Sequence, residues 1–311
     1  MDSKVIKTIV YSILISSSYV LALYFKSSHT VNRTFNRNDP VVIKDRLRRS
    51  IAITILNLII LPFVVKYIIA SDDSTADILN NLGLLPGVKI QDNNNKSSLL
   101  GLAFEFSQYS FKTTLLDNFK TLLLFIILFI GPLFANVYYG LNYLLEDIVA
   151  YPRWEFLRDL VISPLTEELI YTCCITSIFI PLIHDGSVDA NSILIFTPLL
   201  FGMAHLHHAV ELYRSHQHKL IAIVLTCLLQ MMYTTLFGTI TNYIFVRTGS
   251  IWCCFISHAF CNANGLPALT IHSNSKVIKL FYSFLLIIGI LFFFFYFDSL
   301  TISENGLLEI N

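Results

Sequence analysis

The sequence predicts an all-α protein that crosses a membrane several times. Hydrophobic residues make up 55% of the 311 residues and charged residues only 14%, whereas soluble chains carry roughly 25% charged residues. The mean hydropathy is +0.65, and apolar runs of about 20 residues, the length of a membrane-crossing helix, recur along the chain. The formal net charge is zero, so the composition indicates no nucleic acid and no strongly charged partner.

About eight apolar runs are candidates for transmembrane helices. The first is interpreted as a retained anchor, because it is long and lacks a clear small-x-small cleavage site. The only sizeable polar insertion, 71–117, is expected to be a loop that carries one or two interfacial helices. No internal repeat divides the chain, so we predict a single integral membrane domain over residues 1–311. The runs lie near 5–24, 50–70, 119–140, 161–183, 192–209, 219–246, 249–264 and 277–297.

Basic residues predict how the chain is oriented in the membrane. The loop after the first run has an excess of Lys and Arg, which keeps a loop cytoplasmic, whereas the insertion 71–117 leans acidic and is placed in the lumen. With this orientation, the polar ends of three later runs meet at the cytoplasmic side. The loop carries Lys26, Arg33, Arg37, Lys44, Arg46, Arg48 and Arg49 against only Asp39 and Asp45.

Three polar clusters interrupt the apolar runs, and they hold the candidate functional residues. An ionisable group inside a membrane helix costs about 2.5 to 3.5 kcal/mol on insertion scales, so it usually faces a cavity or a partner. The first cluster, "SPLTEELIYT", carries Glu167 and Glu168, and the third, "HAFCN", carries His258 and Asn262. The second, "FGMAHLHHAVE", carries His205, His207, His208 and Glu211.

Helical geometry separates some of these side chains and brings others together. Adjacent helical residues project roughly 100° apart, so Glu167 and Glu168 are expected to have different roles. His258 and Asn262 are four residues apart and therefore point at one spot. Each cluster also has a structural interpretation: paired buried carboxylates, a polar cap at the membrane interface, or an interhelical hydrogen bond.

Glutamate, two histidines and an asparagine together suit amide hydrolysis without a covalent intermediate. A carboxylate in an apolar cavity can take a proton from water, and a neighbouring imidazole can orient that water and pass the proton to the leaving group. A second imidazole and an amide NH₂ can donate hydrogen bonds to the tetrahedral oxyanion, at about 3 to 4 kcal/mol per well-placed donor. The sequence contains no GxSxG, HExxH, Walker loop or GxGxxG motif that would favour a rival chemistry.

The three clusters resemble, in order and spacing, the EExxxR, FxxxH and HxxxN motifs of the type II CAAX prenyl endopeptidases, the Ras-converting enzymes of the endoplasmic reticulum. The resemblance covers a motif-bearing core of about 145–270. It implies removal of the C-terminal aaX tripeptide from farnesylated or geranylgeranylated CAAX proteins, such as Ras-like small GTPases and a-factor-like prenyl peptides. It also implies a multi-pass protein of that membrane, with a conical cavity open to the cytoplasm and lipid, and no cofactor.

The same resemblance implies a role for each candidate residue. Glu167 and His205 are expected to activate water, and His258 and Asn262 to form the oxyanion hole, with no metal. Glu168 is expected to support the site.

The sequence departs from the family pattern at one position, because the motif arginine falls on Thr172. Glu168 therefore has no cationic partner four residues away, and the sequence does not identify the residue that pairs with it.

Two other function classes remain open at this stage. A zinc-dependent intramembrane protease would use Glu167, His205 and His258 as three ligands around an open position. A non-enzymatic transporter or scaffold would use the carboxylates as a proton relay, and a transporter is expected to show repeats or broken helices.

Overall fold

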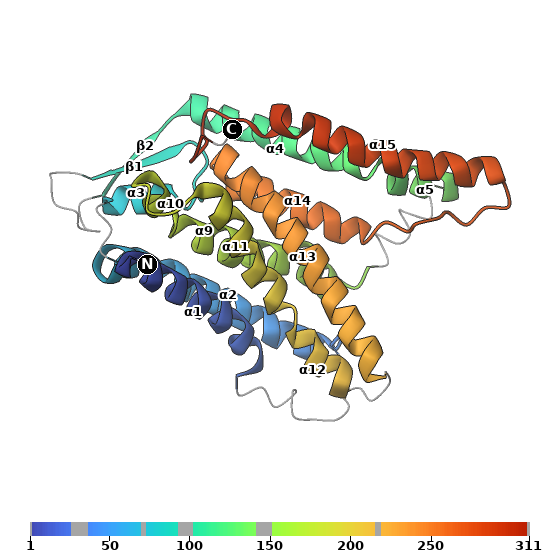
Figure 1. The fold of residues 1–311 in the computed structure, drawn as a ribbon, viewed down its shortest axis with the longest axis horizontal. Coiled ribbons are helices and arrows are strands. Elements are labelled where there is room, and N and C mark those ends of the chain that lie inside the picture. The colour runs from blue at the N-terminus through green and yellow to red at the C-terminus, as the bar shows by residue number, and fades with distance from the viewer. Residues whose placement is uncertain are drawn as a thin grey trace.

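The computed structural model describes residues 2–25, 37–69, 73–92, 102–140, 151–214 and 219–309, and helices dominate these segments (Figure 1). The all-α class is confirmed. The glycosylation sequons at Asn32 and Asn95 and the basic residues Lys26 and Arg33 lie outside the described residues.

Six helices of the described segments are long and apolar enough to cross a membrane. A seventh is added if α4 (Gln108–Leu128) and α5 (Ile130–Tyr139), which meet at an angle of 70°, form one broken span. The polytopic architecture is therefore as predicted, although the described residues contain six or seven such helices and not the predicted eight. The six are α1 (Ser3–Tyr24), Pro40–Ile69, Arg153–His184, Ala190–Tyr213, α13 (Leu220–Thr248) and α15 (Lys276–Thr301).

The difference in count comes from the predicted run 249–264. It forms α14 (Ile251–Asn264), a helix of 14 residues. At 1.5 Å per residue such a helix is about 21 Å long, too short for a hydrocarbon core of about 30 Å. The run is apolar because α14 is packed inside the protein, with Ile251, Cys253 and Cys254 fully buried.

Helix α2 (Pro40–Phe63) begins ten residues before the predicted second run, so part of the predicted basic loop is helical. Asp39 caps this helix by accepting a hydrogen bond from the Val41 N–H at 2.8 Å, and Pro40 occupies the first turn, where its missing N–H costs nothing. The basic residues 44–49 therefore lie on the first turns of α2, which continues into the π-helical segment η2 (Val64–Ile69).

The polar insertion contains a β-hairpin that was not predicted from the sequence. It also contains one short helix, α3 (Thr75–Asn80), in the insertion where one or two interfacial helices were expected. The strands β1 (Val88–Asp92) and β2 (Leu102–Phe106) pair antiparallel. Asn80 attaches the hairpin to α3, because its side chain both donates to the carbonyl oxygen and accepts from the N–H of Ile90, each at 2.9 Å.

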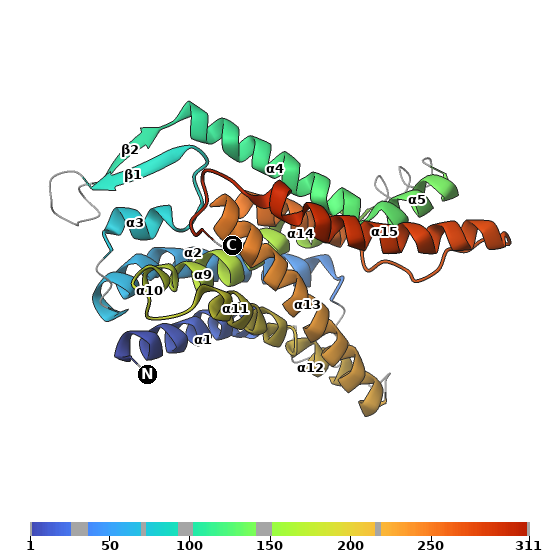
Figure 2. The ribbon, with the colours of Figure 1, turned by 45° about the horizontal axis from the view of Figure 1, so that its top comes forward.

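The helix Arg153–His184 lies at the centre of the bundle. Within its apolar window 83% of the residues are buried, against 17% for α13 and for α15. Helices α1 and α2 pack on one side of it, and α4 and α15 lie side by side on the other (Figures 1 and 2). Helices α11 (Ala190–Ala204) and α13 pack together, and α14 packs against both α4 and α13. The central helix carries the two adjacent glutamates.

Candidate active site

The two glutamates lie where the central helix changes its winding. Pro164 in α8 (Ser163–Glu167) cannot donate a hydrogen bond to the preceding turn, and that turn, η4 (Leu157–Ile162), is wound as a π-helix. A second π-helical segment, η5 (Glu168–Cys174), begins at Glu168. The side chain of Glu167 is 21% exposed and that of Glu168 only 1%. The two carboxylates therefore have different surroundings, and their different roles stay a prediction.

A cavity of about 630 Å³ brings the three polar clusters together. Glu167 lines it from the central helix, His205 from the end of α11, and His258 and Asn262 from α14. These four residues come from three separate parts of the sequence and line one cavity. Glu168 does not line the cavity and lies behind its wall.

His258 connects the two glutamates. Its Nδ1 lies 2.8 Å from Oε1 of Glu168, and its Nε2 lies 3.8 Å from Oε2 of Glu167. The rings of Phe201 and Phe237 lie edge-on to the imidazole, with ring centroids 6.1 and 4.9 Å away. Because Nδ1 is occupied by the buried carboxyl and the ring is flanked by aromatic side chains, Nε2 is the nitrogen that is presented to the cavity side.

Glu168 has two hydrogen-bond partners, and one of them is Thr172. The Thr172 hydroxyl donates a hydrogen bond to Oε2 of Glu168 at 2.6 Å, and it also lies 3.4 Å from the hydroxyl of Thr241. Both carboxyl oxygens of Glu168 are thus occupied, one by Thr172 and the other by His258. Glu168 is held by a hydroxyl and an imidazole in place of the motif arginine.

His205 lies at the C-terminal end of α11, where its own backbone is the helix cap. Its Nδ1 is 2.9 Å from the carbonyl oxygen of Phe201. A carbonyl oxygen only accepts hydrogen bonds, so Nδ1 carries the proton and Nε2 holds a lone pair. Within the described residues no ion pair joins His205 to Glu167, whereas His258 is the imidazole within 4 Å of that carboxylate.

Asn262 makes a structural contact in addition to lining the cavity. Its side-chain NH₂ donates to the backbone carbonyl oxygen of Asp159 at 2.9 Å. Asp159 belongs to the π-helical segment η4, so the bond attaches α14 to the central helix one segment before the glutamates. An amide NH₂ has two hydrogens, and one of them remains for a ligand in the cavity.

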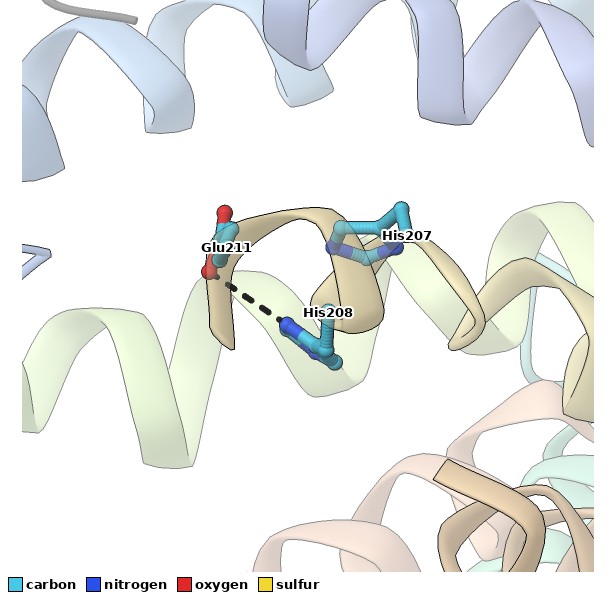
Figure 3. A group of neighbouring side chains, drawn as sticks. All are labelled: His207, His208 and Glu211. Carbon is cyan, nitrogen blue, oxygen red and sulfur yellow. Dashed lines mark ion pairs between the residues drawn. The ribbon is translucent and has the colours of Figure 1, made fainter. Parts of the chain in front are cut away.

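His207 and His208 begin α12 (His207–Arg214), which follows α11 and His205. Nδ1 of His208 lies 3.5 Å from Oε2 of Glu211 (Figure 3). Ligand atoms of His207, His208 and Glu211 lie within 4.8 Å of one another, the only such potential metal-binding group among the described residues. Arg46 and Tyr24 already bind Glu211, at 2.6 and 2.9 Å.

The residues that the zinc alternative requires, Glu167, His205 and His258, do not form such a group in the described part of the chain. Sequence reasoning missed the ion pair between Arg46 and Glu211. The indication in the sequence was Glu211, an unexplained carboxylate just after the apolar run 192–209, together with the basic segment after the first run.

Comparisons with known proteins identify the family to which the chain belongs. The family model described as type II CAAX prenyl endopeptidase Rce1-like matches residues 149–264, which include every candidate residue. CAAX prenyl protease 2 of Saccharomyces cerevisiae is 32% identical over 269 residues, which cover 84% of this chain and 80% of that protein. Probable CAAX prenyl protease 2 of Schizosaccharomyces pombe is 30% identical over 91% of this chain and 90% of its own length.

CAAX prenyl protease 2 of Homo sapiens is 37% identical over a shorter region, 48% of this chain and 46% of the human protein. No solved structure matches the chain significantly. The two yeast relatives are matched along most of their lengths, and the family model covers the three polar clusters. The chain therefore belongs to the Rce1-like family of type II CAAX prenyl endopeptidases.

Proposed function

We propose that this protein is an intramembrane endopeptidase that removes the aaX tripeptide from farnesylated or geranylgeranylated CAAX proteins. The names of the yeast and human relatives support the activity. The observation that carries the proposal is that Glu167, His205, His258 and Asn262, from three separate parts of the chain, line one cavity. The substrates are Ras-like small GTPases and a-factor-like prenyl peptides, which reach the cavity from the cytoplasmic side of the endoplasmic reticulum membrane.

The first chemical step is attack of water on the scissile carbonyl carbon. Glu167 takes the proton of a water molecule held between its carboxylate and Nε2 of His205, while the water oxygen forms a bond to that carbon. The lone pair on Nε2 follows from the bond between Nδ1 and the Phe201 carbonyl oxygen. When the tetrahedral intermediate collapses, the C–N bond breaks and the proton passes to the departing amine through this pair.

His258 and Asn262 stabilise the negative charge on the carbonyl oxygen. One proton lies between Nδ1 of His258 and Oε1 of Glu168, and a second proton on Nε2 makes the His258–Glu168 pair neutral overall. A neutral pair is favoured in a buried, low-dielectric position. Nε2–H of His258 and the remaining N–H of Asn262 then donate to the oxyanion, and Glu168 positions the ring without touching the substrate.

The cavity also has the apolar wall that an isoprenoid needs. Phe125 of α4, Phe129 between α4 and α5, and Phe237 and Ile240 of α13 line it beside the polar residues. A prenyl chain gains about 0.8 kcal/mol for each buried CH₂ group, so it stays in an apolar phase while the peptide reaches the polar residues. This arrangement predicts that the lipid on the cysteine is required for cleavage.

The proposal is tested with purified protein and a farnesylated CAAX peptide beside its unprenylated twin. We expect release of the free tripeptide from the farnesylated peptide and a rate at least tenfold lower from its twin, because the twin loses the apolar contacts. Mass spectrometry of the products locates the cleaved bond. Equal cleavage of both peptides, or no cleavage of either, would contradict the proposed function.

A further inference from the structure

The cavity contains a cationic side chain that the hydrolytic step does not use. Arg37, Arg46 and Arg158 all line it, and a guanidinium is the side chain best suited to bind a carboxylate. Internal carboxylates already neutralise two of the three. Arg46 binds Glu211 at 2.6 Å, and Arg158 binds both carboxylate oxygens of Asp159 at 2.6 and 2.9 Å.

Arg37 is the exception among the described residues. Its side chain is exposed, and it forms neither an ion pair nor a hydrogen bond with the other described residues. Its backbone is nevertheless fixed, because Nη1 of Arg158 donates to the carbonyl oxygen of Arg37 at 3.1 Å and to the side-chain oxygen of Asn38 at 3.0 Å. The nearby carboxylate of Asp39 caps α2 and accepts a backbone N–H there. Arg37 is thus held at the cavity with its charge available.

The substrate class supplies one anion in a defined place. A CAAX sequence ends the chain, so the residue X carries a free α-carboxylate that is ionised near neutral pH. A planar guanidinium binds a carboxylate through two parallel hydrogen bonds, which makes it the best-matched side chain for this group. We propose that Arg37 binds the C-terminal carboxylate of the substrate, an inference that rests on the proposed function.

The position of Arg37 fits this role. Arg158, whose side chain holds the backbone of Arg37, precedes Glu167 by nine residues on the central helix, and Arg37 and Glu167 line the same cavity. Three extended residues span at most about 10 to 11 Å, so the terminal carboxylate of a bound aaX segment stays close to the scissile bond, inside this cavity. A cation in this position selects a scissile bond three residues from the chain end. The enzyme thereby distinguishes a CAAX terminus from an internal prenylated cysteine.

The test compares two farnesylated peptides of one sequence, one with a free C-terminal carboxylate and one with a C-terminal amide. We expect the wild-type protein to cleave the acid with a kcat/KM about 10- to 100-fold higher, the range for a charge-assisted bidentate pair. Arg37→Gln should reduce the acid to the level of the amide, mainly through KM, and should leave the amide unchanged. Arg37→Lys should recover part of the preference.

Arg48→Gln is the matched control, because Arg48 is an exposed basic residue of the same segment that does not line the cavity. It should leave the preference unchanged. The amide peptide reports whether each variant is folded and active. A wild-type enzyme without preference for the acid, or an Arg37→Gln variant that keeps it, overturns the assignment of Arg37. Failure of the proposed function is distinct, since the wild-type protein would then cleave neither farnesylated peptide.

Discussion

At the scale of single residues, the two adjacent glutamates are divided between the cavity and the protein interior. Glu167 lines the cavity, whereas Glu168 is buried with both carboxyl oxygens bonded, to Thr172 and to His258. Different surroundings for Glu167 and Glu168 were predictable from the angle between neighbouring helical side chains. The partner of Glu168 was not, because His258 lies 90 residues away in the sequence and only the packing of α14 brings it near.

The hydroxyl of Thr172 is predicted to hold Glu168 in place for His258. Thr172→Val keeps the shape but removes the donor to Oε2, which leaves a buried carboxyl oxygen without a partner at a cost of about 1 to 3 kcal/mol. We expect a lower midpoint of thermal unfolding in detergent and a severalfold lower kcat on the farnesylated peptide. Thr172→Ser keeps the hydroxyl and is the control. Thr172→Val that matches wild type in both measurements would show that this hydrogen bond is dispensable.

At the scale of elements, apolar periodicity predicted where helices run but not which of them span the membrane. Seven of the eight predicted runs correspond to spanning helices or to the bent pair α4 and α5, whereas 249–264 forms the short buried α14. Both kinds of helix are apolar, since lipid and a protein core exclude water alike. The hairpin of β1 and β2 was missed because its strands have five residues each and are separated by a polar stretch.

The π-helical turns on either side of α8 could not be predicted from the sequence beyond the position of Pro164. Proline breaks the regular pattern of hydrogen bonds, but the way a helix accommodates it depends on the neighbouring helices. Here α14 supplies one contact, because the Asn262 side chain binds the carbonyl oxygen of Asp159 in η4. The sequence identified the residues of the candidate site, and tertiary packing determined which of them touch.

At the scale of the whole molecule, the basic segment that includes the start of α2 predicts a cytoplasmic location for the cavity. Arg37 and Arg46 belong to that segment and line the cavity together with Glu167 and His205. An excess of Lys and Arg keeps a segment on the cytoplasmic side, so the prenylated substrate and the candidate catalytic residues should meet there.

Glycosylation of the native protein tests this orientation. The sequons Asn32-Arg33-Thr34 and Asn95-Lys96-Ser97 fall on opposite sides of the membrane in the predicted topology, and only a lumenal sequon meets the glycosylation machinery. We expect Asn32 to remain unmodified and Asn95 to be the sequon available for a glycan. Peptide mapping before and after glycosidase treatment locates any glycan, and a glycan on Asn32 would reverse the orientation.

The central claim is that Glu167 activates the water, and two matched substitutions test it most directly. Glu167→Gln keeps the shape but removes the base, so kcat on the farnesylated peptide should fall by at least the roughly 10² to 10⁴ that general-base catalysis supplies, with substrate still bound. Glu168→Gln keeps an acceptor for His258 and should retain partial activity. Both variants are measured at equal membrane abundance. Full activity of Glu167→Gln beside an inactive Glu168→Gln would contradict the account and transfer the base to the other carboxylate.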